Sequence, residues 1–115
     1  MKSFVKVMKA LSDLNRVKII KLLQHKSMCV CELQAALSIA QPTVSKHLKI
    51  LEDAQLVCSK KDGLWVNYSI SDGRGSPYAA SLLGSLRHWL DDDMEIEILV
   101  SRISSFDRHK ICAKN

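Results

Sequence analysis

The stretch ELQAALSIAQPTVSKHLKIL, residues Glu32–Leu51, contains two short helical patterns separated by a tight connection. The first helix is predicted over Glu32–Leu37, and the connection over residues 38–40. Val44, Leu48 and Leu51 then recur at the spacing of one helical face, which predicts a second helix. Pro42 fits its first turn, where a missing N–H costs no hydrogen bond.

A small β-hairpin is predicted directly after these helices. Residues 57–59 and 64–70 are rich in β-branched and aromatic residues, and they flank Lys60-Lys61-Asp62-Gly63 with Asp-Gly at the turn. Two short helices followed by a basic hairpin are typical of a winged helix-turn-helix, in which the second helix enters the DNA major groove.

The outer elements are predicted to be helical. The N-terminal helix is predicted to carry Phe4, Val7, Met8 and Leu11 on one face. Ser12 or Asp13 is predicted to cap the helix that follows it. In the capped helix we expect Val17, Ile20, Leu22 and Leu23 to pack inward and Lys18 and Lys21 to face outward.

Beyond the breaker at residues 72–75, Pro77 opens a helix through Leu90. Asp91 to Asp93 then cap a last helix with Met94, Ile98 and Phe106. The predicted fold is mainly α with a small β-hairpin, in the order α-α-α-α-β-β-α-α. Residues 1–115 form one domain for DNA binding and dimerisation.

Composition supports a single soluble domain. The chain has 115 residues, 47% of them hydrophobic, which is enough for one core and too apolar for a disordered tail. Apolar runs fall far short of a membrane span, and lysines interleave with the apolar residues at the N-terminus, so neither a membrane partner nor a secretory signal is expected. We therefore expect a cytoplasmic protein, whose four cysteines are reduced.

The charge indicates a polyanionic partner. The net charge is +5, and all of the excess lies in residues 1–72. On the second helix of the motif and the hairpin, Gln and Ser/Thr can read base edges and Lys can contact phosphates. An alternative is that Lys46 and Lys49 are only the solvated face of a helix. The predicted DNA-binding residues are Gln41, Thr43, Ser45, Lys46, His47, Lys49, Lys60 and Lys61.

A pair of cysteines, Cys29 and Cys31, lies beside the start of the first helix of the motif. The helix dipole there favours thiolate over thiol, which would make a better soft-metal ligand. On a regular helix the two side chains would diverge by about 200°, so binding one ion requires an irregular first turn. Binding would then distort the helix that positions the DNA-reading helix. The alternative is that both cysteines are small apolar fillers.

Three motifs resemble the ArsR/SmtB family, and in particular its arsenite-responsive repressors: CVCEL at 29–33, QPTVSKHL at 41–48 and KDGLWVNY at 61–68. The resemblance implies a homodimeric repressor that holds double-stranded operator DNA until arsenite or antimonite, the inducer, releases it. It also implies three thiolate ligands, the third lying three residues beyond the second, where this chain has Gln34.

Several alternatives remain open at the thiol pair. Cys112 of the same or the partner subunit, a small-molecule thiol or a water could complete the site, whereas Cys58 is expected to be buried and only to pack. Zinc or another soft metal is a competing inducer, although a closed zinc site takes four ligands. An oxidation or persulfide sensor pairing Cys29 or Cys31 with Cys112 would use the same scaffold.

An enzyme is the remote alternative, in the form of a thiol redox protein. The sequence has no Cys-x-x-Cys, no Gly-rich phosphate loop and no G-x-S-x-G, so we expect neither catalysis nor an organic cofactor.

Surplus apolar residues on the first and C-terminal helices predict a two-fold interface, unless they cover the protein's own core. They are Phe4, Met8, Leu82, Leu83, Leu86, Trp89, Leu90, Ile98 and Leu99.

Overall fold

The computed structural model describes residues 1–111 and confirms the predicted fold class and element order. The elements are α1 (Lys2–Ala10), α2 (Leu14–Leu23), α3 (Val30–Leu37), α4 (Gln41–Asp53), β1 (Val57–Asp62), β2 (Trp65–Ile70), α5 (Pro77–Leu86) and α6 (Met94–Ser101). A 3₁₀ segment, η1 (Ile103–Ser105), and a single helical turn, α7 (Arg108–Ile111), follow them. No helix in this part of the chain is long and apolar enough to span a membrane.

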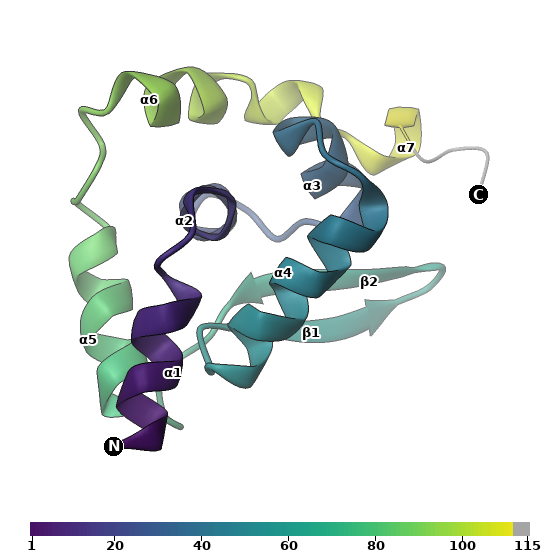
Figure 1. Ribbon diagram of the computed structural model, residues 1–115. Coiled ribbons are helices and arrows are strands. Elements are labelled where there is room, and N and C mark those ends of the chain that lie inside the picture. The colour runs from purple at the N-terminus through teal and green to yellow at the C-terminus, as the bar shows by residue number, and fades with distance from the viewer. Residues whose placement is uncertain (112–115) are drawn as a thin grey trace.

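Helix α2 forms the centre of the molecule, with the other elements arranged around it (Figure 1). It contacts α3, α4, α6 and β2, and its residues Ile19, Ile20 and Leu22 are completely buried. Helices α3 and α4 pack against each other, and the hairpin extends from the end of α4. Helix α7 lies beside α3, so the C-terminal segment returns to the helix that follows the thiol pair.

Lys21 is buried, although the sequence pattern predicts that it faces outward. Its side chain is 1% exposed, and Nζ donates to Leu86 O at 2.7 Å, to Trp89 O at 2.9 Å and to Asp91 Oδ1 at 2.8 Å. The amine therefore binds carbonyls at the end of α5, where a helix leaves acceptors unpaired. Lys18 is more exposed and pairs with Glu95 at 2.9 Å.

The helices near the C-terminus are shorter than predicted. Helix α5 ends at Leu86 instead of Leu90: the N–H groups of Arg87 and His88 bond to carbonyls three residues back, and Leu90 has a left-handed φ of +69°. Asp93 caps α6 by accepting from Ile96 N at 3.2 Å, as predicted. Phe106 lies beyond α6 and η1, and packs against the core from there.

The hairpin turn lies one residue further along the chain than predicted. Strand β1 runs through Asp62, which pairs with Trp65, so the two turn residues are Gly63 and Leu64. Gly63 has a φ of +60°, while Leu64 is not among the residues with positive φ. A positive φ at the first of the two turn residues only is typical of a type II′ turn, whose twist matches that of the two strands.

Candidate nucleic-acid interface and thiol pair

The turn between α3 and α4 sets the position of α4. Ser38 ends α3 in the left-handed conformation, with φ 55° and ψ 43°. Ala40 is the N-cap of α4 and makes no side-chain cap, so Pro42 in the first turn helps to start this helix. Val44, Leu48 and Leu51 are buried, as the spacing predicted. The exposed side chains of α4 include Gln41, Thr43, Ser45, Lys46 and Lys49.

His47 differs from the other predicted DNA-binding residues on α4. Its side chain is only 9% exposed, and Arg16 Nη1 lies 3.2 Å from its Nδ1. Arg16 Nε also donates to Ala10 O at 2.7 Å, so the arginine links α1, α2 and α4. His47 is inward because it lies three residues after the buried Val44, on the same face of the helix. His47 is therefore buried, whereas the other predicted DNA-binding residues of α4 are exposed.

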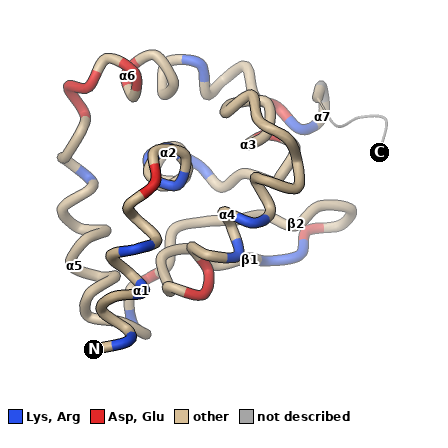
Figure 2. Tube along the Cα trace, in the orientation of Figure 1, with Lys and Arg blue, Asp and Glu red and all other residues tan. Residues whose placement is uncertain are grey.

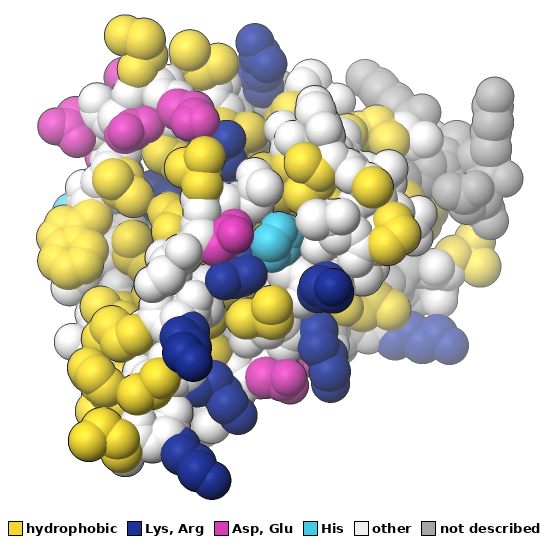
Figure 3. Space-filling view, viewed as in Figure 1, with side chains coloured by type: hydrophobic (Ala, Val, Ile, Leu, Met, Phe, Trp, Pro, Cys, Tyr) yellow, Lys and Arg dark blue, Asp and Glu magenta, His cyan; other side chains and the backbone are white. Residues whose placement is uncertain are grey.

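The wing adds two exposed lysines to the same part of the molecule. Lys60 and Lys61 lie on β1 opposite Asn67 and Val66. Successive residues of a strand point to opposite faces, so the two amines extend to different sides of the ribbon. Lys and Arg positions occur along α1, α4 and β1 (Figure 2), and basic side chains spread over these elements on one face (Figure 3).

The two cysteines lie on either side of the start of α3. Cys29 is the N-cap, with φ −90° and ψ 173°, and its side chain is 2% exposed. Cys31 is the second residue of the helix and is half-buried. Cys29 therefore lies outside the helical backbone, as an N-cap residue does, while Cys31 lies within the helix.

Glu32 completes this cap from inside the helix. Its Oε1 accepts a hydrogen bond from Cys29 N at 3.0 Å, while the Cys29 sulfur accepts from the backbone N–H of Glu32. Such a reciprocal pair is a capping box, with cysteine in the place of serine or threonine. Glu32 was not predicted as a functional residue, although the Cys29-x-x-Glu32 spacing carries the signal.

The pKa of Cys29 is raised, whereas the sequence pattern predicts that the helix start favours the thiolate. Burial raises the pKa of its thiol, and the hydrogen bond from the Glu32 backbone N–H only partly offsets this effect. The Glu32 carboxylate raises the pKa further, and the Arg108 charge lowers it. Burial therefore keeps Cys29 a neutral thiol at neutral pH.

A hollow of about 230 Å³ connects the thiol pair with α4 and the hairpin. One wall comes from Cys29, Val30 and Cys31, and Gln41 contributes the start of α4. The hairpin supplies the remaining, mostly apolar wall, which consists of Leu64, Trp65 and Val66. A molecule bound to both sulfurs would therefore touch α4 and the wing as well.

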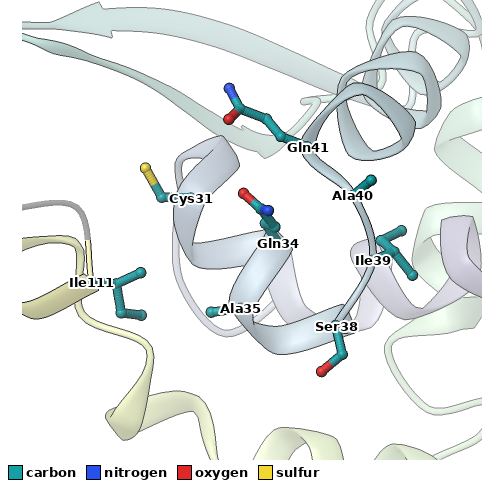
Figure 4. Close-up of a pocket in the computed structure, with 8 residues that line it drawn as sticks. All are labelled: Cys31, Gln34, Ala35, Ser38, Ile39, Ala40, Gln41 and Ile111. Atoms are coloured by element: carbon teal, nitrogen blue, oxygen red, sulfur yellow. The ribbon is translucent and has the colours of Figure 1, made fainter.

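Cys31 also lines a second hollow, of about 500 Å³ (Figure 4). Cys31 and Gln34 line it from α3, Gln41 from the start of α4 and Ile111 from α7. The next residue along the chain, Cys112, was predicted as the third ligand and lies outside the described residues. Within residues 1–111, no group of three or more His, Cys, Asp or Glu side chains is arranged to hold a metal ion.

Cys58 does not belong to this site. It is exposed on β1, contrary to the expected burial, and its sulfur lies 3.5 Å from Ser69 Oγ of the paired strand. Neither hollow beside the thiol pair includes it. Both Cys29 and Cys58 are free thiols.

Arg108 is a second residue that the sequence did not reveal. Its guanidinium contacts Glu32 of α3 and Asp62, Trp65 and Asn67 of the hairpin. Nothing in the local pattern of residues 106–111 indicates these contacts, because the partners lie at least 41 positions away.

Comparisons with known proteins agree with this arrangement. The family model described as "Bacterial regulatory protein, arsR family" matches residues 13–59. The arsenical resistance operon repressor of Escherichia coli (strain K12) is 30% identical over 114 residues, which cover 95% of this chain and 95% of the relative.

Solved structures show the same similarity. HlyU from Vibrio cholerae N16961 matches with a TM-score of 0.63 and 27% identity, over 75% of this chain and 89% of that one. The same protein described as reduced HlyU matches with a TM-score of 0.62 and 27% identity, over 75% and 86% of the two chains. The transcriptional repressor BigR from Xylella fastidiosa matches with a TM-score of 0.58 and 26% identity, over 71% and 80%.

Proposed function

The chain belongs to the ArsR family of bacterial transcriptional regulators, and we propose that it is a repressor that responds to a metalloid. It binds operator DNA as a homodimer and leaves it when arsenite or antimonite binds to Cys29 and Cys31. The observation that carries this proposal is the hollow shared by both cysteines, Gln41 of α4 and the wing residues Leu64–Val66. A ligand held there lies between the two elements that contact DNA.

DNA binding uses the exposed residues of α4 and β1. Gln41, Thr43 and Ser45 lie at the start of α4, where recognition helices contact base edges. Lys46 and Lys49 on α4, and Lys60 and Lys61 on β1, bind phosphates. His47 supports α4 from beneath through Arg16.

The chemistry of the inducer suits a neutral buried thiol. In arsenous acid, As(OH)₃, each As–S bond forms as one As–O bond breaks, and the thiol proton leaves with the hydroxide as water. Two thiols therefore release two waters, with no change in the oxidation state of arsenic or sulfur. In the reduced protein the reaction starts from the protonated Cys29 thiol, whose pKa is raised by burial, and needs no prior ionisation of it.

Release from DNA follows from the position of Cys29 in the helix cap. To share one arsenic atom with Cys31, the Cys29 sulfur gives up its place against the Glu32 N–H, and the first turn of α3 rearranges. Because α3 packs on α4, DNA and inducer favour different arrangements of the same helices. The expected coupling is negative in both directions.

Cys112 is the proposed third thiolate. The observation in its favour is that Ile111, the preceding residue, lines the hollow beside Cys31. A third thiol would replace the last hydroxide of arsenous acid and release a third water. A small-molecule thiol or the hydroxide itself is the alternative, because Gln34 occupies the position of the third cysteine in the resembling repressors.

The dimer interface is proposed on the exposed apolar residues of α1 and the C-terminal region. Phe4 and Met8 are exposed on α1, and Trp89, Leu90 and Ile98 are exposed around α5 and α6. In contrast, Leu83, Leu86 and Leu99 are buried in the core of the single chain. The proposed interface therefore uses only part of the predicted apolar set.

The deciding experiment measures binding to a duplex from the DNA upstream of this protein's own gene. Arsenite, antimonite, zinc and hydrogen peroxide are added separately to the reduced protein. We expect arsenite and antimonite to release the wild type and the matched control Cys58→Ser, but not Cys29→Ser. Release by zinc alone, or unchanged release of Cys29→Ser by arsenite, contradicts the proposal.

Thiol oxidation is the second candidate trigger. The structural similarity to HlyU, which was also solved as reduced HlyU, favours it. In that case a peroxide oxidises Cys29 or Cys31, and Cys112 forms a disulfide with the oxidised residue. Release by hydrogen peroxide that is lost in Cys112→Ser, without release by arsenite, would support this candidate instead.

A further inference from the structure

Arg108 anchors the C-terminal turn on a buried carboxylate. Its backbone N donates to Glu32 Oε2 at 3.2 Å, and its Nη2 lies 3.3 Å from Glu32 Oε1. The Arg108 side chain is 13% exposed and that of Glu32 is 3% exposed, so little water reaches the pair. Lys26 Nζ, 3.7 Å from Glu32 Oε2, is much more exposed. Arg108 is therefore the main charge that compensates the buried Glu32.

The same guanidinium also holds the wing. Nη2 donates to Asn67 Oδ1, and Nη1 lies 3.8 Å from Asp62 Oδ2. The guanidinium carbon lies 5.1 Å from the centre of the Trp65 ring, in a cation–π arrangement. Asn67 Nδ2 donates to Asp62 Oδ2 at 3.2 Å, so the two strands present one joined set of partners.

These contacts form a continuous connection between the thiol pair and the wing. Glu32 Oε1 accepts from Cys29 N and also faces Arg108 Nη2. A change at Cys29 therefore acts on the same carboxylate oxygen that holds the arginine. The planar guanidinium contacts Glu32, Asn67 and Asp62 at once, which the single ammonium of a lysine does less well.

We infer that Arg108 is a positioning residue that fixes the wing relative to the start of α3 through Glu32, and so couples the thiol pair to the wing. The positioning of the wing by Arg108 is a property of the protein without any ligand. The coupling to an inducer rests on the proposed function. When the first turn of α3 rearranges, the hydrogen bond from Cys29 N to Glu32 Oε1 is lost, the hold of Glu32 on Arg108 loosens, and the wing moves away from its DNA-binding position.

The fluorescence of Trp65 measures whether Arg108 holds the wing in place. In a reference protein carrying Trp89→Phe, Trp65 is the single tryptophan, and acrylamide quenching reports how well it is covered. Arg108→Ala should raise the quenching constant roughly twofold, because the indole loses the cation over its ring. The matched control, Arg102→Ala, removes an exposed arginine of the same region and should leave quenching unchanged.

Glu32→Gln separates wing positioning from simple shielding of Trp65. This change leaves the arginine in place but weakens its anchor, so the quenching constant of Trp65 should rise here too. The quenching constant of Arg108→Lys should lie between those of the reference protein and Arg108→Ala. If Glu32→Gln has the same quenching constant as the reference protein, Arg108 only covers the indole and the inference is overturned. Far-UV circular dichroism checks folding, and Arg108→Lys decides the matter if Arg108→Ala does not fold.

Operator binding then tests the coupling. With the wild-type tryptophans, Arg108→Ala should bind the upstream duplex about tenfold more weakly, as expected for loss of charge-assisted hydrogen bonds. Arsenite should also weaken its binding by a smaller factor than it weakens wild-type binding. An equal factor in both proteins overturns the coupling but not the proposed function. If arsenite does not release the wild type, the proposed inducer fails and the coupling with it, while the quenching result decides the wing-positioning part.

Discussion

Cys29 N donates a hydrogen bond to Glu32 Oε1 at 3.0 Å, and both side chains are almost completely buried. The first cysteine of the pair is thus also the cap of the helix that supports α4. A ligand at this thiol would compete with the hydrogen bond that the sulfur accepts from the Glu32 N–H.

The two free thiols should differ in reactivity. Cys29 is buried and its pKa is raised by desolvation, whereas Cys58 is exposed on β1. Because the thiolate is the nucleophile, iodoacetamide at pH 7.5 should modify Cys58 well before Cys29. Mass spectrometry of peptides over time measures both rates. Denatured protein, in which the rates should converge, is the control, and equal rates in the folded protein would contradict the assigned burial.

The pH dependence of binding should distinguish zinc from arsenite. Zinc binds thiolates, so it must displace the Cys29 proton, and its affinity should fall as the pH falls from 8 to 6. Arsenite loses hydroxide with that proton as water, so its affinity should change little over this range. Titrations followed by sulfur-to-metal absorbance at several pH values test this difference. An arsenite affinity that falls as steeply as that of zinc would count against binding through a neutral thiol.

Lys46 should contribute to DNA affinity without reading the sequence. If it contacts a phosphate, Lys46→Ala should weaken binding to all duplexes alike and reduce the slope of log K against log salt by about 1. Arg87→Ala, which removes an exposed charge at the end of α5, is the matched control. Fluorescence anisotropy at four salt concentrations measures the slopes. Identical slopes in the two variants would exclude a phosphate contact by Lys46.

The buried Lys21 should be important for stability. Lys21→Met leaves the Leu86 carbonyl without its donor, and we expect a loss of about 3 kcal/mol in the free energy of unfolding. Lys18→Met breaks a more exposed pair with Glu95 and should cost less than about 1 kcal/mol. Urea denaturation compares the two variants. Similar midpoints would show that the Lys21 amine makes no special contribution.

The Lys21 hydrogen bond also holds the pKa of Asp91 below its ordinary value. Its contribution is present above the unfolded-state pKa and is lost as the pH falls through the folded-state value. Asp91→Asn should therefore reduce the acid dependence of stability in the most acidic part of a urea-denaturation series. An unchanged profile would contradict the pairing.

The proposed dimer should depend on the exposed apolar face of α1. Phe4 contacts Tyr78 edge to face, with the ring centres 5.4 Å apart, and both rings remain exposed. Phe4→Glu places a charge on this face and should shift the protein toward monomer in sedimentation equilibrium. Leu64→Glu puts the same charge at the exposed tip of the wing and should leave the assembly unchanged. If both variants stay dimeric, the interface lies elsewhere.

Local sequence patterns determined the elements of this protein. The spacing of Val44, Leu48 and Leu51, the proline at position 42 and the glycine at position 63 act within a few residues, so they predict α4 and the hairpin from sequence alone. The Cys29/Cys31 pair is equally visible in the sequence, as is its place beside α3.

Only the tertiary structure decided what surrounds these side chains. Lys21 turns inward because α5 ends against α2 and offers its carbonyls, 65 positions further along the chain. Cys29 stays protonated because packing removes it from water, an effect that outweighs the hydrogen bond from the Glu32 N–H. Arg108 reaches Glu32 across 76 positions. Periodicity shows which residues share a face, whereas burial and charge compensation depend on what packs against that face.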